Sequence, residues 1–238
     1  MNPEKIIKEI NTNGFIVLNN FFKKKLINDS RSEYLKSLNH LKIHPPSQKF
    51  NPSSLKKRPW RKFAVGSRNG YGENYSQLLQ TTYFHQNDLR YPNLSKLFNE
   101  MINIRNLLTN LPNNYGSNVK DDFWNACRVH HYPQGGGHMA THQDTLFPKL
   151  LKKFEIPFLQ IMVPLSRRGI EFNTGGGYII KNGKKILFEN IDSIGSIIMF
   201  DGSIFHGVED IDLNKLLNFE SKKGRIAVFV NLYKNEFK

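Results

Sequence analysis

The sequence predicts a mainly β fold with flanking helices (α+β), an antiparallel sandwich or barrel. After about Asp121 the chain consists of short runs rich in β-branched and aromatic residues, separated by turns. Before that point, stretches with a helical spacing of apolar residues predominate. The length of 238 residues suits one domain. We therefore expect a single domain over 1–238, with a helical buttress and lid region over 1–120 and a β core that carries the functional site over 121–238.

The first 40 residues are expected to alternate between helix and strand. "PEKIIKEINTNG" places apolar side chains at Ile6, Ile7 and Ile10, a helical spacing, and Gly14 follows as a stop signal. "FIVLNNFF" predicts a strand, and "KKLINDSRSEYLKSLNHL" returns to the helical period. Further along, "NLSKLFNEMINIRNLLTNL" is the clearest amphipathic helix. These helices are expected to buttress the β core.

Residues 44–91 show no sustained period. Four prolines interrupt the segment, and "GSRNGYGENY" adds glycine and asparagine. A long irregular segment inside a compact domain is more often a lid or a binding loop than a linker. We expect it to cover the site, with the candidate lid residues Trp60, Arg61, Arg68, Tyr71 and Tyr75.

The second half of the chain is expected to supply the strands. The predicted strands are "FWNACRVHHY", "FLQIMVPLS", "GGYII", "KILFE", "SIIMF" and "RIAVFVNLY". Between the first two, Gly135 to Gly137 predict a turn that lets the chain pass close to the site, and "NTGGGYII" likewise predicts a hairpin turn.

Composition limits the class of protein. A hydrophobic fraction of 39% allows a packed core, and Cys127, the only cysteine, excludes an internal disulfide. No apolar run reaches the ~18 residues of a membrane span and no signal sequence is visible, so we expect a cytoplasmic protein without membrane association. A net charge of +14 is compatible with nucleic acid as a partner. Because the lysines are scattered singly, a solvated basic surface is the simpler expectation.

A candidate metal site lies in "HYPQGGGHMATHQDT". In an extended chain His142 and Asp144, two residues apart, point to the same face. His206 follows beyond a turn at the end of a later β run. Two imidazoles and one carboxylate in a facial arrangement suit non-haem Fe(II) and leave positions open for a co-substrate and O2. The alternative is three unconnected surface residues. His138 would add a zinc site only on a helix, which the preceding glycines exclude.

Candidate residues for an anionic ligand lie on two predicted strands. Arg225 opens "RIAVFVNLY", and its rigid fork of donors suits a carboxylate. The alternative is a surface arginine paired with an acid such as Glu220. Arg128, His130 and Tyr132 alternate on one face of "FWNACRVHHY", so a pocket lined by one is within reach of the others, although a structural role is the simpler expectation for each alone.

With these residues in place, the chain resembles the Fe(II)- and 2-oxoglutarate-dependent dioxygenases, in their phytanoyl-hydroxylase-like or prolyl-hydroxylase-like branch. The matching segments are "HQD", "FHGVED" and "GRIAVF", in the family's order. The resemblance covers roughly residues 123–233, and "NTNGFIVLNNFF" adds a looser likeness. Tyr132 matches a tyrosine, ten residues before the first metal histidine, that helps to bind 2-oxoglutarate in several branches.

The resemblance implies a double-stranded β-helix, a cupin-like jelly roll of two sheets with the metal at its mouth. Fe(II) would be held by the two histidines and the aspartate, which are therefore the candidate catalytic residues as well. 2-Oxoglutarate would chelate the iron and reach Arg225 with its far carboxylate, with Tyr132 and Arg128 as further cofactor-binding candidates. With O2 as the second co-substrate, the products would be succinate, CO2 and a hydroxylated or desaturated substrate. The carboxylate of Asp144 argues against halogenation.

The substrate stays open at this stage. A small polar metabolite such as an amino acid derivative is the first expectation, and a protein side chain or an alkylated nucleic acid is the alternative. A non-catalytic jelly-roll binding module would use the same fold without turnover. The complete ligand set disfavours that module, because an idle site has no physical need for it.

Overall fold

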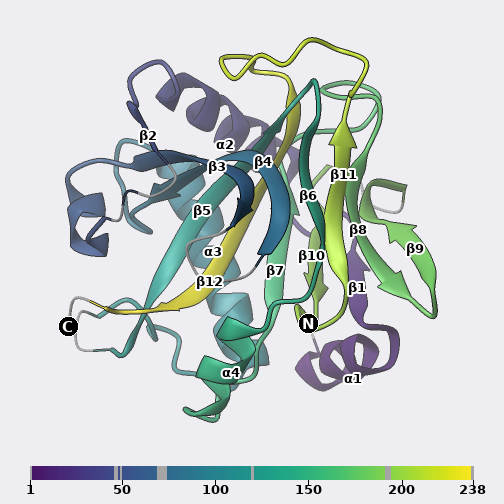
Figure 1. Cartoon of the computed structure of the whole chain (residues 1–238). Helices are drawn as coiled ribbons and strands as arrows, with labels where there is room; N and C mark the ends of the chain where they lie inside the picture. Colours follow the sequence, from purple (N-terminus) through teal and green to yellow (C-terminus); the bar gives the residue numbers. More distant parts are fainter. Residues whose placement is uncertain are drawn as a thin grey trace.

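The structure, a computed structural model, describes residues 2–45, 48, 50–68, 74–118, 121–190 and 194–236. In this part of the chain twelve strands form one sheet, in the order β1-β10-β7-β12-β5-β4-β6-β11-β8-β9, with β3 also paired to β4 and β2 to β3 (Figure 1). The strands are β1 (Phe15–Leu18), β2 (Ile43–His44), β3 (Trp60–Arg68), β4 (Asn74–Phe84), β5 (Phe123–Pro133), β6 (Gly137–His142), β7 (Gln160–Pro164), β8 (Gly176–Lys181), β9 (Lys184–Leu187), β10 (Ile197–Phe200), β11 (His206–Ile211) and β12 (Gly224–Lys234).

Strand β4 is the corner at which the sheet folds back on itself. Its residues from Gln80 to Phe84 pair with β5, whereas Gln77 and Leu78 pair with β6. On one side of this corner lie β5, β12, β7, β10 and β1, and on the other lie β6, β11, β8 and β9. The chain from β5 to β12 passes repeatedly between these two halves, which is the path of a double-stranded β-helix. The expected jelly roll is confirmed, and β4 joins its two halves into one sheet.

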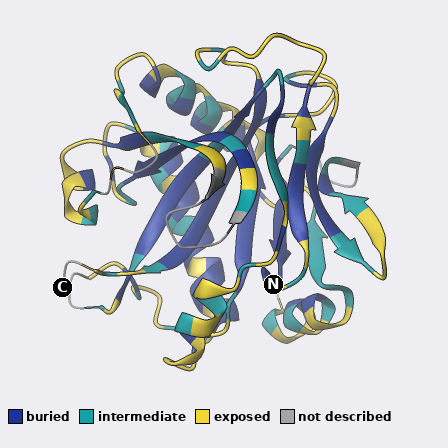
Figure 2. Cartoon of the chain, viewed as in Figure 1, coloured by how far each residue is buried: buried dark blue, intermediate teal, exposed yellow. Residues whose placement is uncertain are grey.

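Three helices cover the outer face of the larger half-sheet. They are α1 (Pro3–Asn13), α2 (Lys24–Ser37) and α3 (Pro92–Leu108); the shorter α4 (Leu146–Lys152) and the 3-10 helices η1 (Pro52–Lys56) and η2 (Phe188–Asn190) lie in connections. On β12, Ile226, Val228 and Val230 pack with the apolar faces of these helices in the largest core cluster. The intervening residues of β12 face the concave interior. Figure 2 shows the buried residues concentrated along the central strands.

The predicted N-terminal elements are present. Helix α1 ends at Gly14, whose φ of 80° is left-handed and whose N–H donates to the carbonyl of Ile10. The strand that follows is β1, and α2 and α3 occupy the two predicted helical segments. None of the helices in the described ranges is long and apolar enough to cross a bilayer.

The expectation of a largely irregular segment at 44–91 is wrong. Strands β3 and β4 form a long antiparallel pair there, so residues 1–120 supply part of the sheet in addition to helices. The period was hidden because polar residues on both faces of β4 are buried. Gln80, fully buried, accepts from Arg61 and donates to the Phe219 carbonyl, so its polar atoms are satisfied inside the fold.

Two of the candidate lid residues belong to the interior and do not form a lid. Trp60 is 6% exposed and Arg61 is 2% exposed. Tyr75 contacts the candidate metal site, as described below. The Arg68 side chain and Tyr71 lie outside the described residues.

Candidate metal centre and its cavity

Two strands of the smaller half-sheet bring the two histidines together. His142 ends β6 and His206 begins β11, and the two residues are directly opposite in the antiparallel register. Their ring centroids lie 4.3 Å apart, and each residue is 8% exposed. Asp144 follows His142 by two residues, and its Oδ2 lies 3.7 Å from Nε2 of His206. One ligand atom from each of the three lies within 4.8 Å of the others, the single such group of acids, histidines and cysteine within the described ranges.

Backbone carbonyls fix the tautomer of both imidazoles. Nδ1 of His142 lies 2.9 Å from the carbonyl oxygen of Ala140, and Nδ1 of His206 lies 2.9 Å from that of Ile204. A carbonyl oxygen only accepts, so each Nδ1 carries the proton and donates it. Nε2 of each ring is therefore the nitrogen that can present a lone pair to a metal. An Nδ1–H held in this way orients a metal-binding imidazole.

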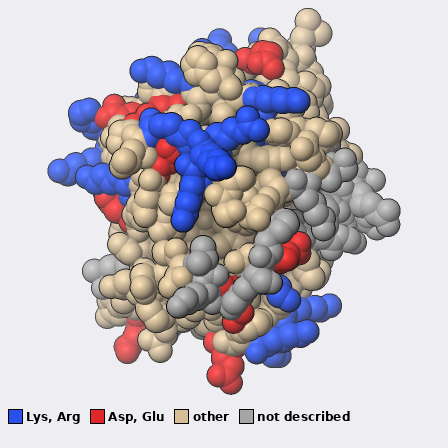
Figure 3. Space-filling view, turned by 90° about the vertical axis from the view of Figure 1, so that its left-hand side faces the viewer, with Lys and Arg blue, Asp and Glu red and all other residues tan. Residues whose placement is uncertain are grey.

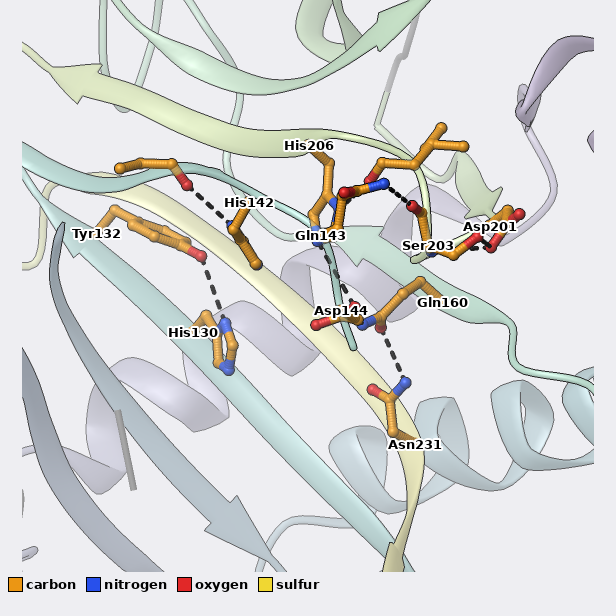
Figure 4. Close-up of polar contacts among 12 residues, drawn as sticks. His130, Tyr132, His142, Gln143, Asp144, Gln160, Asp201, Ser203, His206 and Asn231 are labelled. Carbon is orange, nitrogen blue, oxygen red and sulfur yellow. Dashed lines mark hydrogen bonds and ion pairs between the residues drawn. The ribbon is translucent and has the colours of Figure 1, made fainter. Parts of the chain in front are cut away.

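Two amide side chains hold the Asp144 carboxylate (Figure 4). Nε2 of Gln160 donates to Oδ2 of Asp144 at 2.7 Å, and Nδ2 of Asn231 donates to Oε1 of Gln160 at 2.8 Å. The backbone N–H of Asp144 donates to the Gly202 carbonyl at 2.9 Å. A Cβ on Gly202 would meet Oδ2 of Asp144 at 2.6 Å, so only glycine fits beside this carboxylate. A chain of two hydrogen bonds, from Asn231 of β12 to Gln160 of β7 and from Gln160 to Asp144, thus holds the carboxylate in place.

The three candidate ligands border a cavity of about 410 Å³ between the two half-sheets. Its walls combine many aromatic rings with a few polar side chains. Tyr75 of β4 stacks on the His142 ring with centroids 4.0 Å apart and an interplanar angle of 19°. The charged residues in the wall are Lys62, Arg128, Arg225 and Asp144.

Arg225 lies in the cavity wall and is buried, with 2% of its surface exposed. Its Nε donates to the carboxylate of Glu189 in η2, which is equally buried, and Nη2 lies 3.3 Å from Sδ of Met162. The guanidinium carbon lies 5.5 Å from the ring centroid of Tyr132. The surface alternative, a pairing with Glu220, does not occur.

Two glycines of β8 make room for this ion pair. A Cβ on Gly177 would meet Nη2 of Arg225 at 2.5 Å, and a Cβ on Gly176 would meet Oε2 of Glu189 at 2.6 Å. The predicted turn in "NTGGGYII" therefore ends earlier than expected, because these glycines belong to a strand.

The three alternating residues of β5 all line the cavity. Nε of Arg128 donates to Nε2 of His130 at 3.0 Å, which leaves the His130 proton on Nδ1, 3.4 Å from the Tyr132 hydroxyl. Burial and then the charges of Arg128, Arg225 and Lys62 hold the pKa of His130 well below its ordinary value. His130 is therefore a neutral link between Arg128 and Tyr132. Burial raises the pKa of Tyr132 to about 12, so its hydroxyl stays protonated.

The structure thus brings together all six candidate residues named from the sequence. His138 stays outside the group and contacts Ser76 and the Gly136 carbonyl, and Gly135 and Gly136 form the expected turn with left-handed φ values of 87° and 104°. Sequence reasoning missed Glu189, Gln160 and Asn231. No spacing rule connects these residues to the site, since each comes from a different element and only the folded sheet places it there.

The surface shows charges of both signs. In Figure 3, Lys and Arg side chains gather over the upper part of one face, and Asp and Glu side chains lie beside them. A mixed surface of this kind is what a solvated basic protein presents.

The donor set fits a divalent transition metal. Two imidazoles that present Nε2 and one carboxylate converge beside an open cavity, the histidines buried and the aspartate partly buried, and this combination suits non-haem Fe(II). A site limited to three protein ligands leaves coordination positions for smaller molecules.

Comparisons with known proteins agree on the fold. No protein-family model matches the sequence, and no curated protein matches it significantly. Among solved structures, a prolyl hydroxylase of Trichoplax adhaerens, in complex with a hypoxia inducible factor oxygen degradation domain peptide fragment, is similar with a TM-score of 0.58 and 13% identity over 98% of this chain and 89% of that one. A Pseudomonas putida prolyl-4-hydroxylase is similar with a TM-score of 0.58 and 11% sequence identity, and the match covers 98% of each chain. A non-haem α-ketoglutarate-dependent epimerase from nogalamycin biosynthesis has a TM-score of 0.51 and 10% identity, and the match covers 98% of this chain and 82% of the epimerase. The chain therefore has the fold of the 2-oxoglutarate- and Fe(II)-dependent oxygenases.

Proposed function

We propose that this protein is an Fe(II)- and 2-oxoglutarate-dependent dioxygenase that hydroxylates or desaturates a small polar metabolite. The observation that carries the proposal is the group of His142, Asp144 and His206, two buried histidines and a partly buried aspartate, with both imidazoles held in the tautomer that presents Nε2. A non-catalytic binding module would not need this arrangement. The shared fold with 2-oxoglutarate oxygenases supports the same reading.

The chain's own residues would hold and orient the reactants. Nε2 of each histidine and a carboxylate oxygen of Asp144 would bind Fe(II), and Gln160 would fix the carboxylate's direction. When bound, Fe(II) and 2-oxoglutarate supply the oxidising chemistry: 2-oxoglutarate and O2 become succinate and CO2, and the second oxygen atom enters a C–H bond of the substrate on hydroxylation or leaves as water on desaturation. The aromatic walls exclude bulk water from this reaction.

Arg225 is the proposed anchor for the far carboxylate of 2-oxoglutarate. It is a cation in the cavity wall, and its fixed planar fork suits a carboxylate. Glu189 would hold the guanidinium through Nε, and Gly177 would leave room at the Nη2 side. The Tyr132 hydroxyl, protonated and on the same wall, is a second proposed donor to the co-substrate.

The size of the cavity supports a small-molecule substrate. About 410 Å³ lies in the range of small-molecule sites, and strands of both half-sheets contribute residues to the wall. One neighbour was solved with a peptide, so a protein side chain is the alternative that the experiment must test.

The test is oxygen-dependent succinate formation by purified protein with Fe(II) and 2-oxoglutarate. A cell extract is split into a low-mass fraction and a macromolecular fraction, and each is added separately. We expect the low-mass fraction to stimulate succinate release in the parent and in His138→Ala, a control in the same strand, but not in Asp144→Ala or His206→Ala. Stimulation by the macromolecular fraction alone would overturn the substrate assignment. Succinate formation in none of the mixtures would overturn the activity.

A further inference from the structure

We propose that Lys62 of β3 binds an anionic group of the substrate, a carboxylate or a phosphate, and thereby helps to select the small molecule that enters the cavity. This inference rests on the proposed function, because it assigns a substrate contact in the same cavity. Lys62 is partly buried and lies in the cavity wall.

The register of three strands directs Lys62 toward the cavity. Lys62 lies opposite Thr81 of β4, which in turn lies opposite His130 of β5. Directly opposed residues of antiparallel strands share one face of a sheet, and all three residues line the cavity. The charge of Lys62 is one of those that lower the pKa of His130, as expected for an ammonium on this face.

The ammonium of Lys62 lacks a partner of its own in the described part of the chain. Within the described ranges its Nζ makes neither a hydrogen bond nor an ion pair, and burial alone lowers its pKa. Nζ retains accessible surface, so a ligand can reach it. A cation withdrawn from water is costly unless an anion pairs with it. An anionic group bound at Nζ would offset this cost.

Lys62 and Arg225 are placed to hold different anionic groups. Strand β3 is separated from β12 by β4 and β5, which is about 14 Å across the sheet at the usual strand spacing. In the proposed function 2-oxoglutarate has one carboxylate at the metal and the other at Arg225. The ammonium of Lys62 therefore serves the second organic ligand, the substrate.

The wall beside Lys62 is apolar. Ala64 is the next inward residue of β3, and Tyr83 lies on the inward face of the neighbouring β4. The ring of Phe63, which also borders the cavity, packs edge-on against Phe219 with centroids 4.6 Å apart. Aromatic and aliphatic groups pack well against such a surface. A ring that carries one anionic group is therefore a suitable probe.

The experiment measures the binding of three probes by calorimetry to protein loaded with Mn(II) and saturated with 2-oxoglutarate. Phenylacetate and phenylacetamide have nearly the same shape and differ in charge, and benzyl phosphate carries a phosphate in place of the carboxylate. We expect the parent to bind at least one of the two anions about tenfold or more tightly than the amide, since a hydrogen bond to a charged group contributes that much. The anion that binds more tightly identifies the group that Lys62 prefers.

Two variants and a matched control assign the preference to Lys62. Lys62→Met removes the charge and keeps much of the length of the side chain, so it should abolish the preference, whereas Lys62→Arg should retain most of it. Lys57→Met removes an exposed lysine three residues before β3 and changes the net charge by the same amount. The preference should be unchanged in this control.

The outcomes separate this inference from the proposed function. Equal binding of all three probes, binding of none, or a preference that survives in Lys62→Met would overturn the inference while 2-oxoglutarate binding stands. Displacement of 2-oxoglutarate by the anions would also overturn it, because they would then occupy the co-substrate site. Failure of 2-oxoglutarate to bind the Mn(II) form would instead overturn the proposed function, and titration of the probes against the metal form alone then decides the role of Lys62. The comparison in the parent protein requires no variant to fold.

Discussion

Replacement of Glu189 by glutamine tests how the arginine of the cavity is held. The glutamine oxygen can still accept from Nε of Arg225, but the negative charge is lost. Both side chains of the pair are only 3% exposed. Removal of one partner from a buried ion pair typically costs 3–5 kcal/mol, and since the hydrogen bond survives we expect about 2–4 kcal/mol of lost unfolding free energy. For a chain of this length that lowers Tm by roughly 4–16 °C.

The same variant should respond more strongly to co-substrate. In Glu189→Gln the far carboxylate of 2-oxoglutarate replaces the missing charge beside Arg225, so 2-oxoglutarate with Mn(II) should raise Tm more than in the parent. Thermal unfolding under nitrogen, with and without 2-oxoglutarate, measures both effects. Glu209→Gln, which removes a partly exposed pair with Lys185, is the matched control and should change stability by less than about 1 kcal/mol. Equal Tm gains in Glu189→Gln and the parent would refute the reasoning.

Three further predictions concern other parts of the site. Gln160→Leu should weaken metal binding about 10- to 100-fold, because Asp144 loses its orienting donor, and Mn(II) titration measures this; unchanged affinity would contradict it. Gly177→Ala should weaken 2-oxoglutarate binding about tenfold or more by displacing Arg225, with Mn(II) affinity unchanged, as calorimetry can determine. Burial lowers the pKa of His131 from 6.5 to about 4. Below pH 6.5 the unfolded chain binds a proton at this histidine that the folded chain does not, so the free energy of unfolding is unaffected above pH 6.5 and falls as the pH drops toward 4, by about 3 kcal/mol in all. Urea unfolding of the metal-free protein should show a shallower pH dependence in His131→Asn; an unchanged slope would exclude this cause.

The metal site could be predicted because its ligand types and their order along the chain match those of the family that the sequence resembles. His142 and Asp144 share a face through a two-residue spacing. His206 was expected only beyond a turn after a β run, and strand β11, which it begins, was not predicted. The alternation of Arg128 and Tyr132 on β5 depends on the same period of two. Periodicity therefore placed three residues of the wall, Arg128, His130 and Tyr132, on one face.

The remaining features depend on tertiary contacts that no local pattern encodes. Strands β3 and β4 were missed because buried polar residues such as Gln80 bond to side chains and carbonyls far along the chain. The partner of Arg225 is Glu189, 36 residues away in a short 3-10 helix that carries no signal of its own. Gln160 reaches Asp144 because β7 pairs with β10, at Gln160 and Phe200, and the backbone of Asp144 is bonded to Gly202 just beyond β10. Such contacts follow from the packing of the whole sheet.

An anaerobic titration of the protein with Fe(II) and 2-oxoglutarate tests the central claim most directly. Chelation of Fe(II) by a 2-oxo acid gives a visible charge-transfer absorption, which reports metal and co-substrate in one site. We predict this absorption in the parent and in His138→Ala, its loss in His142→Ala, and a higher 2-oxoglutarate requirement in Arg225→Gln. Absence of the absorption in the parent, or its persistence in His142→Ala, would contradict the assignment of the metal centre.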